Sequence, residues 1–259
     1  MIGIYDSGLG GLSVFKEIIA LPGDRDYLYF ADSRHCPYGS KSNEFLRGRA
    51  QEIARFLNSR GADMIVVACN TATSAAIGTL REQFDIPFVG MEPAIKPAIL
   101  NSRSGVIGVL ATAVTLTGEK YNRTLAQYAA AGDDVRVIEQ VGYGLVEAVE
   151  QGRIHSEQTV ALLHKYIDPM LDAGADHIVL GCTHYPFLTE EIERITAGRA
   201  VIVNPAPAVA RQAIKLYQET PRRPGAWQFF SSAEFTPNAQ TVIAQICGGH
   251  DYCLEQNIL

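Results

Sequence analysis

Residues 61–69 read Gly61-Ala62-Asp63-Met64-Ile65-Val66-Val67-Ala68-Cys69. They align without gaps on a second stretch, Gly174-Ala175-Asp176-His177-Ile178-Val179-Leu180-Gly181-Cys182. In both stretches an apolar run of strand length ends in a small residue and a cysteine. A repeat at this spacing indicates two structurally similar halves.

Two further pairs of segments repeat in the same order. Ile2–Ser7 lies over Ile107–Thr112, and Glu92-Pro93-Ala94 lies over Asn204-Pro205-Ala206. Apolar strand-like runs alternate with helical patterns along the whole chain, which favours parallel sheets. We therefore predict an α/β fold of two similar α/β domains with mainly parallel sheets, related by pseudo-twofold symmetry, with the active site in the cleft between them.

Proline-rich segments near 93–97 and 205–207 are plausible crossover linkers. They predict a first domain of residues 1–95 plus 208–259 and a second domain of residues 96–207. Helical periodicity is clear over Ser42–Arg60 and Ser156–Ala173. The expected strands are Ile2–Tyr5, Asp26–Phe30, Met64–Ala68, Phe88–Gly90, Gly105–Ala111, Val135–Ile138, His177–Gly181, Ala200–Val203 and Trp227–Ser231.

The composition narrows the class of protein. Of the 259 residues, 47% are hydrophobic and 19% are charged, which is typical of a folded globular chain. We expect no membrane span and no signal peptide, because the apolar runs are short and the start of the chain lacks a basic segment. The net charge of −6, with no basic run longer than Arg222-Arg223, argues against a nucleic-acid partner. Five cysteines without a CxxC motif indicate cytosolic thiols rather than disulfides.

The two repeated cysteines are candidates for chemistry. Ligands of open α/β sheets bind at the carboxyl ends of strands, and a helix that starts there favours anions. Two thiols that face each other across one cleft can remove a proton from one face of a carbon and return one to the opposite face. One thiol must then start as thiolate, which costs an ordinary thiol about 2 kcal/mol at pH 7. His184 and Asp6 are candidate helpers because they lie near the two motifs.

Simpler interpretations compete with this one. A lone cysteine at a strand end is usually a small buried hydrophobe, and we assign that role to Cys36, Cys247 and Cys253. Cys182 and His184 are zinc-ligand types, but no second close pair completes a metal site, so we expect none. Asp6 is a possible helix cap.

Three other segments carry weaker signals. Asp6-Ser7-Gly8-Leu9-Gly10-Gly11 matches no nucleotide-binding pattern and fits either a tight turn or a ligand cradle. Cys36-Pro37-Tyr38-Gly39-Ser40 is typical of a turn. Glu147 and Glu150 share one helical face and, on spacing alone, are expected at the solvated surface.

The motifs together resemble the glutamate racemase family, the cofactor-independent amino-acid racemases of bacterial cell-wall synthesis. The resemblance rests on four ordered motifs that span nearly the whole chain, Asp6–Gly11, Pro37–Gly39, Ala68–Thr71 and Gly181–Pro186. It implies interconversion of L- and D-glutamate by two-base proton transfer at Cα, without any cofactor. It also implies a cytoplasmic enzyme that supplies D-glutamate for peptidoglycan, possibly as a homodimer.

The resemblance further implies roles for individual residues. Cys69 would take the proton from D-glutamate with help from Asp6, and Cys182 would take it from L-glutamate with help from His184 and Glu147. Substrate-binding groups would come from the motif loops and from the equivalent loop of the second half. These are Asp6, Ser7, Tyr38, Gly39, Asn70, Thr71, Thr112, Thr115, Thr183 and His184.

Three alternatives remain open at this point. The substrate could be another acidic amino acid such as aspartate. A thiol hydrolase could use Cys182 as nucleophile and His184 as base, and would not need Cys69. A binding module without chemistry could use the glycine loop alone.

Overall fold

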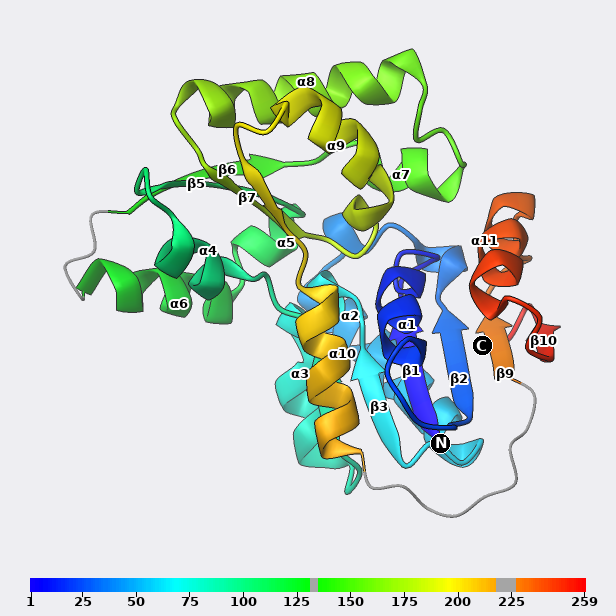
Figure 1. The fold of residues 1–259 in the computed structure, drawn as a ribbon. Helices are drawn as coiled ribbons and strands as arrows, with labels where there is room; N and C mark the ends of the chain where they lie inside the picture. Colours follow the sequence, from blue (N-terminus) through cyan, green and yellow to red (C-terminus); the bar gives the residue numbers. More distant parts are fainter. Residues whose placement is uncertain (131–134, 218–226) are drawn as a thin grey trace.

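Two separate parallel sheets form the framework of the protein (Figure 1). The structure is a computed structural model, and it describes residues 1–130, 135–217 and 227–259. The first sheet has the strand order β10-β9-β2-β1-β3-β4 and the second has the order β6-β5-β7-β8. The strands are β1 (Ile2–Asp6), β2 (Tyr27–Ala31), β3 (Met64–Val67), β4 (Phe88–Gly90), β5 (Val106–Ala111), β6 (Arg136–Val141), β7 (His177–Gly181), β8 (Val201–Val203), β9 (Trp227–Ser231) and β10 (Tyr252–Glu255).

The strand order repeats between the two sheets. The run β2-β1-β3-β4 has the same connectivity as β6-β5-β7-β8, and every pairing is parallel. The repeated sequence segments occupy equivalent strands, β1 with β5 and β3 with β7. The first sheet differs only in β9 and β10, which extend its β2 edge. The predicted α/β class with parallel sheets is therefore confirmed.

Helices cover both faces of each sheet (Figure 1). In the first half α1 and α10 lie on one face and α2 and α3 on the other, while α8 and α9 pack above the second sheet and α4 and α6 below it. The helices are α1 (Leu12–Ile19), α2 (Asn43–Ser59), α3 (Asn70–Gln83), α4 (Ile95–Asn101), α5 (Ala113–Leu116), α6 (Glu119–Ala130), α7 (Leu145–Glu150), α8 (Glu157–Asp172), α9 (Thr189–Thr196), α10 (Ala206–Leu216) and α11 (Pro237–Cys247), with 3-10 turns η1 (Ser33–His35), η2 (Tyr38–Ser40) and η3 (Tyr185–Leu188).

Side-chain caps explain why the two expected long helices start where they do. Ser42 accepts a hydrogen bond from the backbone N–H of Phe45 at the start of α2, and Ser156 accepts one from Thr159 at the start of α8. Each hydroxyl satisfies one of the unpaired donors of a first turn. Both helices begin one residue after the predicted start because that residue is the cap.

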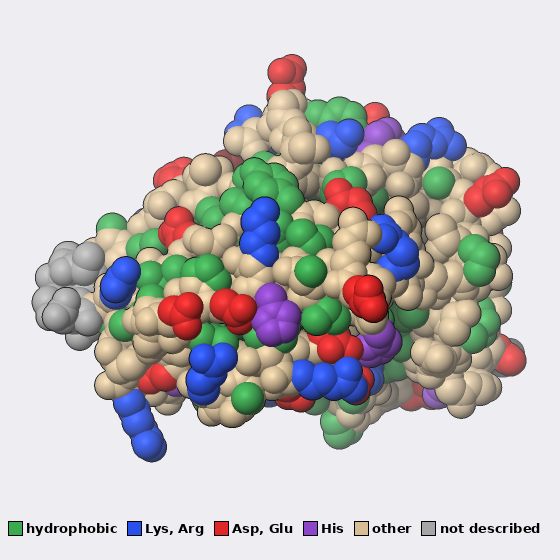
Figure 2. Space-filling view, turned by 90° about the horizontal axis from the view of Figure 1, so that it is seen from above, with side chains coloured by type: hydrophobic (Ala, Val, Ile, Leu, Met, Phe, Trp, Pro, Cys, Tyr) green, Lys and Arg blue, Asp and Glu red, His purple; other side chains and the backbone are tan. Residues whose placement is uncertain are grey.

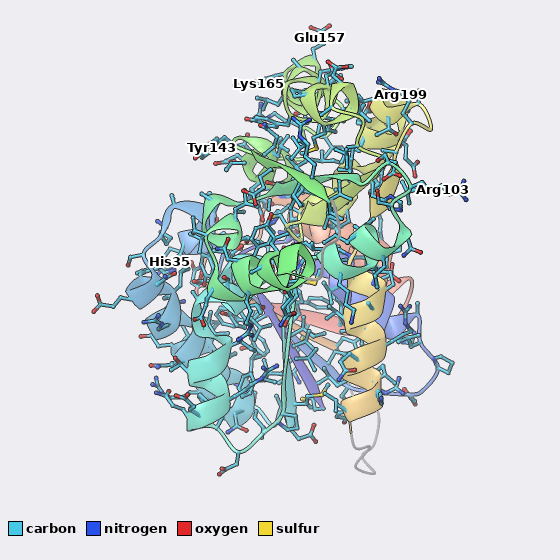
Figure 3. All side chains as sticks on the ribbon, turned by 90° about the vertical axis from the view of Figure 1, so that its left-hand side faces the viewer. His35, Arg103, Tyr143, Glu157, Lys165 and Arg199 are labelled. Carbon is cyan, nitrogen blue, oxygen red and sulfur yellow. The ribbon has the colours of Figure 1, made fainter. Side chains whose placement is uncertain are left out.

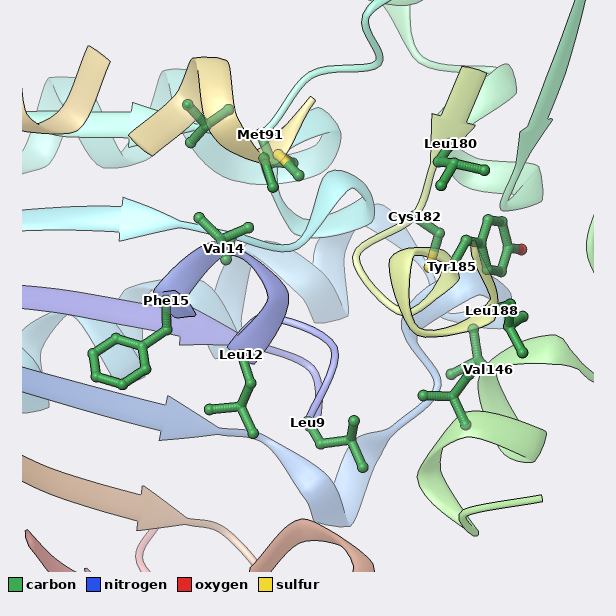
Figure 4. Close-up of a cluster of buried hydrophobic side chains, with 14 of the residues drawn as sticks. Leu9, Leu12, Val14, Phe15, Met91, Val146, Leu180, Cys182, Tyr185 and Leu188 are labelled. Atoms are coloured by element: carbon green, nitrogen blue, oxygen red, sulfur yellow. The ribbon is translucent and has the colours of Figure 1, made fainter. Parts of the chain in front are cut away.

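One buried cluster joins the two halves (Figure 4). Leu9 and Leu12 from the start of the first half lie in the same cluster as Val146 and Leu188 from the second. Burial of apolar surface contributes about 25 cal/mol per Å², so a core shared in this way holds the halves together.

All nine expected strands are present, with ends shifted by at most a few residues. The strand β10 was not predicted, because this four-residue edge strand is mostly exposed and has no apolar run to mark it. Strand membership is consistent with domains of residues 1–95 plus 208–259 and residues 96–207, and these boundaries stay a prediction. No helix in the described parts of the chain is both long and apolar enough to cross a bilayer. On the face in Figure 2, basic and acidic side chains are interspersed.

Phe15 provides a test of how the C-terminal strand is attached. Its ring makes edge-to-face contacts with Tyr27, Trp227 and Phe229, at centroid distances of 5.3, 5.4 and 5.5 Å. We expect Phe15→Ala to lower the free energy of unfolding by about 3–5 kcal/mol, because it empties a buried site that links α1 to β9. Urea denaturation measures this, with the partly exposed Phe45→Ala as control. A loss below about 1 kcal/mol would show that β9 is held by other contacts.

Candidate active site

Loops from both sheets line one cavity. In each half the strand order reverses between the first and third strands, β1 and β3 or β5 and β7, and ligands bind at the carboxyl ends of strands at such a switch point. A cavity of about 120 Å³ lies where these ends meet. The predicted site residues that line it are Ser7, Tyr38, Gly39, Cys69, Asn70, Thr71, Thr112, Glu147, Cys182, Thr183 and His184.

Both repeated cysteines border this cavity, one from each half. Cys69 is 5% exposed and Cys182 is 7% exposed. Cys69 is the N-cap residue of α3, and its sulfur accepts a hydrogen bond from the backbone N–H of Ala72 at 3.5 Å. Burial, reinforced by the nearby charge of Asp6, raises the pKa of Cys69 well above its ordinary value. The Ala72 N–H acts in the opposite sense, because it stabilises the thiolate.

A histidine and a carboxylate stand behind Cys182. The Sγ of Cys182 lies 3.8 Å from Nδ1 of His184, and the Nε2–H of His184 donates to Oε1 of Glu150 at 2.6 Å. Burial alone lowers the pKa of His184. The hydrogen bonds to Cys182, Cys36 and Glu150 outweigh it and raise that pKa well above the ordinary value. The same pairing overcomes the opposing effect of burial on Glu150 and lowers its pKa.

The structure does not show the expected pairing of His184 with Glu147, and the helper role of Glu147 stays a prediction. The structure pairs His184 with Glu150, one turn further along α7, while Glu147 lines the cavity without a hydrogen bond to His184. Spacing alone does not distinguish the two glutamates on this helical face, and the family resemblance implied Glu147. Which one meets His184 depends on how the last turn of α7 faces the glycine loop. The surface expectation is wrong for Glu150, whose side chain is 19% exposed.

The glycines of the first loop make room for this pair. A Cβ on Gly10 would lie 2.3 Å from Nδ1 of His184, and a Cβ on Gly8 would lie 2.0 Å from Oε1 of Glu150. The N–H of Leu9 donates to the same Glu150 oxygen at 2.8 Å. The loop therefore has a role beyond the two that its sequence suggested, a tight turn and a ligand cradle. It lets two side chains of the second half come close, and it reaches the cavity through Ser7.

Asp6 and Thr115 lie outside the lining of this cavity. Asp6 is fully buried and accepts hydrogen bonds from the Gly8 N–H at 3.1 Å and the Thr183 hydroxyl at 2.9 Å. Burial raises the pKa of its carboxyl group. Thr115 supports the cavity wall through a hydroxyl chain, in which Thr112 lies 2.9 Å from both Thr115 and Thr71.

Asn70 is the clearest sign that the cavity is built for a polar ligand. It is buried and lines the cavity, yet neither its Nδ2 nor its Oδ1 has a hydrogen-bond partner among the described residues. An unpaired buried amide costs about 1–3 kcal/mol, so a protein retains one where a ligand completes it. None of the described residues lining the cavity is Lys or Arg, so hydroxyl, amide and backbone groups supply the donors.

The turn that carries Tyr38 is anchored by a buried ion pair. The Tyr38 hydroxyl donates to Asp32 at 2.5 Å, and Asp32 also receives two bonds from the Arg49 guanidinium at 2.7 and 3.0 Å. Burial by itself raises the pKa of Asp32, but the bonds from Arg49 and Tyr38 lower it overall. Sequence reasoning missed both Asp32 and Arg49, which stand outside the motifs.

The cavity is bordered on one side by the loop after β6, which the analysis also missed. Gly142, Tyr143 and Gly144 line it, and the Tyr143 side chain is 68% exposed. Figure 3 shows Tyr143 and His35 on the same side of the molecule, one on each half. No residue type in this loop marks it as part of a site.

Cys36, Glu150 and His184 have metal-ligand atoms within 4.8 Å of one another. Their hydrogen bonds do not suit an ion. Oε1 of Glu150 already accepts from the Leu9 N–H, the His184 Nε2–H and, at 3.7 Å, the Cys36 thiol. Burial raises the pKa of Cys36 to about 11, and its thiol donates a hydrogen bond to Glu150 in this arrangement.

Glu150→Gln tests the charge pairing. The raised pKa of His184 contributes stability that is fully present at pH values below its pKa in the unfolded state. This stability is lost as the pH rises through the pKa of His184 in the folded state. The lowered pKa of Glu150 contributes stability that is fully present at pH values above its pKa in the unfolded state. This stability is lost as the pH falls through the pKa of Glu150 in the folded state. At pH values between the folded-state pKa values of Glu150 and His184, we expect the free energy of unfolding of the variant to be about 3 kcal/mol lower than that of the wild type. The gap should shrink at both pH extremes.

Urea denaturation over a pH series measures this gap, and Glu147→Gln is the matched control on the same helix. Equal effects of the two substitutions, or a gap that is constant with pH, would contradict the pairing of His184 with Glu150.

Comparison with known proteins identifies the family of the chain. The Asp/Glu/Hydantoin racemase family matches residues 10–213. Glutamate racemase of Roseiflexus sp. is 48% identical over 84% of this chain and 79% of its own, and that of Ralstonia nicotianae is 43% identical over 95% and 89%. A solved structure of Escherichia coli glutamate racemase in complex with L-glutamate and the activator UDP-MurNAc-ala is 32% identical, with a TM-score of 0.86 over 98% of this chain and 97% of that one. With its repeated sheets and its shared two-cysteine cavity, the chain belongs to the Asp/Glu/Hydantoin racemase family.

Proposed function

We propose that the protein is a glutamate racemase that interconverts L- and D-glutamate by proton transfer at Cα between two thiols, without a cofactor. The observation that carries the proposal is that Cys69 and Cys182, from equivalent strand ends of the two halves, line one cavity. The names of the relatives support glutamate as the substrate.

The reaction needs one thiolate and one thiol at a time. A Cys69 thiolate takes the Cα proton of D-glutamate, and the electron pair of the broken C–H bond passes into the substrate carboxylate. The Cys182 thiol then gives its proton to the opposite face of Cα, which yields L-glutamate and a Cys182 thiolate. The reverse reaction starts from that thiolate. General acid–base catalysis of this kind contributes typically 10²–10⁴-fold.

Each thiol has its own supporting groups. His184, held by Glu150, serves Cys182, and we propose Glu150 for the role first expected of Glu147. The charge of Asp6 raises the pKa of Cys69, which makes a Cys69 thiolate a stronger base, and Asp6 accepts a hydrogen bond from the Thr183 hydroxyl. In the buried cavity, donors aimed at the substrate carboxylate are worth more than in water, because they stabilise the charge that develops there.

We propose that the substrate's amino and carboxylate groups bind to Ser7, Asn70, Thr71, Thr183 and the Tyr38-Gly39 turn. The free amide of Asn70 and the N-terminus of α3 support a carboxylate at this end of the cavity. Thr112 supports Thr71 from the other half.

The wider role follows from the family resemblance. We propose that the enzyme works in the cytoplasm and supplies D-glutamate for peptidoglycan, and its five free cysteines are consistent with a reducing compartment. Homodimer formation stays a prediction.

A second candidate is a thiol hydrolase, which the 3.8 Å approach of Cys182 to His184 favours. The two candidates differ in their need for Cys69. We expect Cys69→Ala and Cys182→Ala each to lower racemisation more than a hundredfold, because each removes a positioned acid or base. Cys247→Ala, at a buried cysteine outside the cavity, should leave the rate unchanged.

The measurement is optical rotation together with deuterium uptake at Cα, for each enantiomer in heavy water and without added cofactor. Full racemisation by Cys69→Ala would exclude the two-thiol scheme. Faster turnover of aspartate than of glutamate by the wild type would change the substrate.

Asn70→Leu tests the binding role of the free amide. The variant keeps the size of the side chain but removes its polar atoms, so the free energy of unfolding should not fall, while KM for glutamate rises at least about tenfold. Asn70→Asp identifies the bound group: it should weaken binding further if the partner is a carboxylate, and strengthen it if the partner is the ammonium group. Steady-state kinetics and thermal melting measure both variants. An unchanged KM in Asn70→Leu would remove Asn70 from the site.

A further inference from the structure

The glutamate that pairs with His184 sits at the end of a very short helix. Helix α7 has six residues and lies between two left-handed glycines, Gly144 at φ 81° and Gly152 at φ 68°. The last four carbonyl groups of an α-helix have no hydrogen-bond partner inside the helix. In a helix as short as α7 they are most of its carbonyl groups. Glu150 is the last residue of α7, so its position depends on what holds that end.

A residue from the other half of the molecule holds it. Nδ2 of Asn238 donates to the carbonyl oxygen of Val149 at 2.9 Å and to that of Glu150 at 3.2 Å. Gly152 permits this approach, since a Cβ there would lie 2.9 Å from Oδ1 of Asn238.

The helix that carries Asn238 is firmly placed. Asn238 lies in the first turn of α11, whose N-cap Thr236 accepts a hydrogen bond from Ala239. Ala239, Ile243 and Cys247 are buried in the same core cluster as Val149. Figure 1 shows α11 beside β9 with α7 above it. The described residues of the second half contain no counterpart of this C-terminal segment.

Glu150 is thus fixed at both of its ends by the first half. Asn238 holds its backbone, and the Leu9 N–H and the Cys36 thiol hold its carboxylate. From that carboxylate the contacts continue through His184 to the sulfur of Cys182. A small rotation of α7 would move Oε1 away from His184, and a misplacement of about 1 Å can cost on the order of a hundredfold in rate.

We propose that Asn238 is a positioning residue that aligns the Glu150–His184 pair for proton transfer at Cys182, and that the C-terminal extension of the first sheet serves this purpose. The proposal rests on the proposed racemase function. Asn238 does not line the substrate cavity, and we propose that its effect reaches Cys182 through Glu150 and His184.

The test compares Asn238→Ala and Asn238→Asp with Gln240→Ala. Both substitutions at position 238 remove the amide donor, and Asn238→Asp keeps the size of the side chain. The control removes an amide donor of the same helix, since Gln240 donates to the Phe235 carbonyl within its own segment. A role confined to the stability of α11 would affect the control and the test variants alike.

The kinetic readout separates the two thiols. Enantiomers have equal free energies, so kcat/KM must be the same in both directions, and isotope effects carry the directional information. We expect kcat of both Asn238 variants to fall on the order of tenfold, with KM changed less than about twofold. The primary isotope effect should rise with L-glutamate deuterated at Cα, which Cys182 deprotonates. It should not rise with the deuterated D-enantiomer, because a slower step at Cys182 makes proton removal by Cys69 less rate-limiting.

A second readout does not depend on turnover. In protein labelled with ¹⁵N-histidine, the hydrogen-bonded Nε2–H of His184 should give a downfield proton resonance, identified by its loss in His184→Gln. We expect this resonance to shift or to exchange faster with water in both Asn238 variants and to be unchanged in Gln240→Ala.

An unchanged resonance in both Asn238 variants would overturn the proposal, and so would isotope effects that rise equally for the two enantiomers. Failure of the racemase assignment is distinguishable, because the wild type itself would then leave glutamate unchanged. In that case the resonance alone decides whether Asn238 aligns His184.

Discussion

The hydrogen bond between His184 and Glu150 is the contact on which the arrangement of the site depends. It joins a buried imidazole to a carboxylate at 2.6 Å and stands directly behind Cys182. A charge in such a place must be paired, because the cost of leaving it unpaired in the interior is several kcal/mol. Positions 8 and 10 require glycine, because a Cβ on Gly8 would overlap Glu150 and a Cβ on Gly10 would overlap His184. The pair therefore holds the second half against the glycine loop of the first, together with the shared apolar core.

The cavity combines two requirements that oppose each other. Burial stabilises developing charge on a bound substrate through fixed donors, yet the same burial raises the pKa of Cys69 and keeps it protonated. The N–H of Ala72 offsets part of that cost at Cys69, while His184 lies beside Cys182. None of the described residues lining the cavity is Lys or Arg, so apart from His184 its donors are neutral hydroxyl, amide and backbone groups.

Much of the fold was predictable because strand patterns and turn residues act locally. Three repeated segments in the same order, among them Gly61–Cys69 and Gly174–Cys182, predicted two similar halves with parallel sheets, and the nine expected strands are present. The exposed edge strand β10 was missed because it buries too little apolar surface to leave a pattern. Of the site, the residues that immediately follow strands were found, since parallel strands bring their carboxyl ends together. Asp32, Arg49 and Glu150 were missed or misassigned, since their partners lie far away in the chain.

The sequence by itself determined the two-half architecture and the pair of thiols, because hydrophobic periodicity and strand-end residues are properties of short segments. It also determined the family, because four ordered motifs stand in the chain as written. Only the tertiary structure decided that Glu150 rather than Glu147 meets His184, that Asp6 lies behind the cavity wall, and that Asn238 holds the end of α7. The physical reason is that side chains three residues apart on a helix share a face. Packing against distant segments decides which of them a partner can reach.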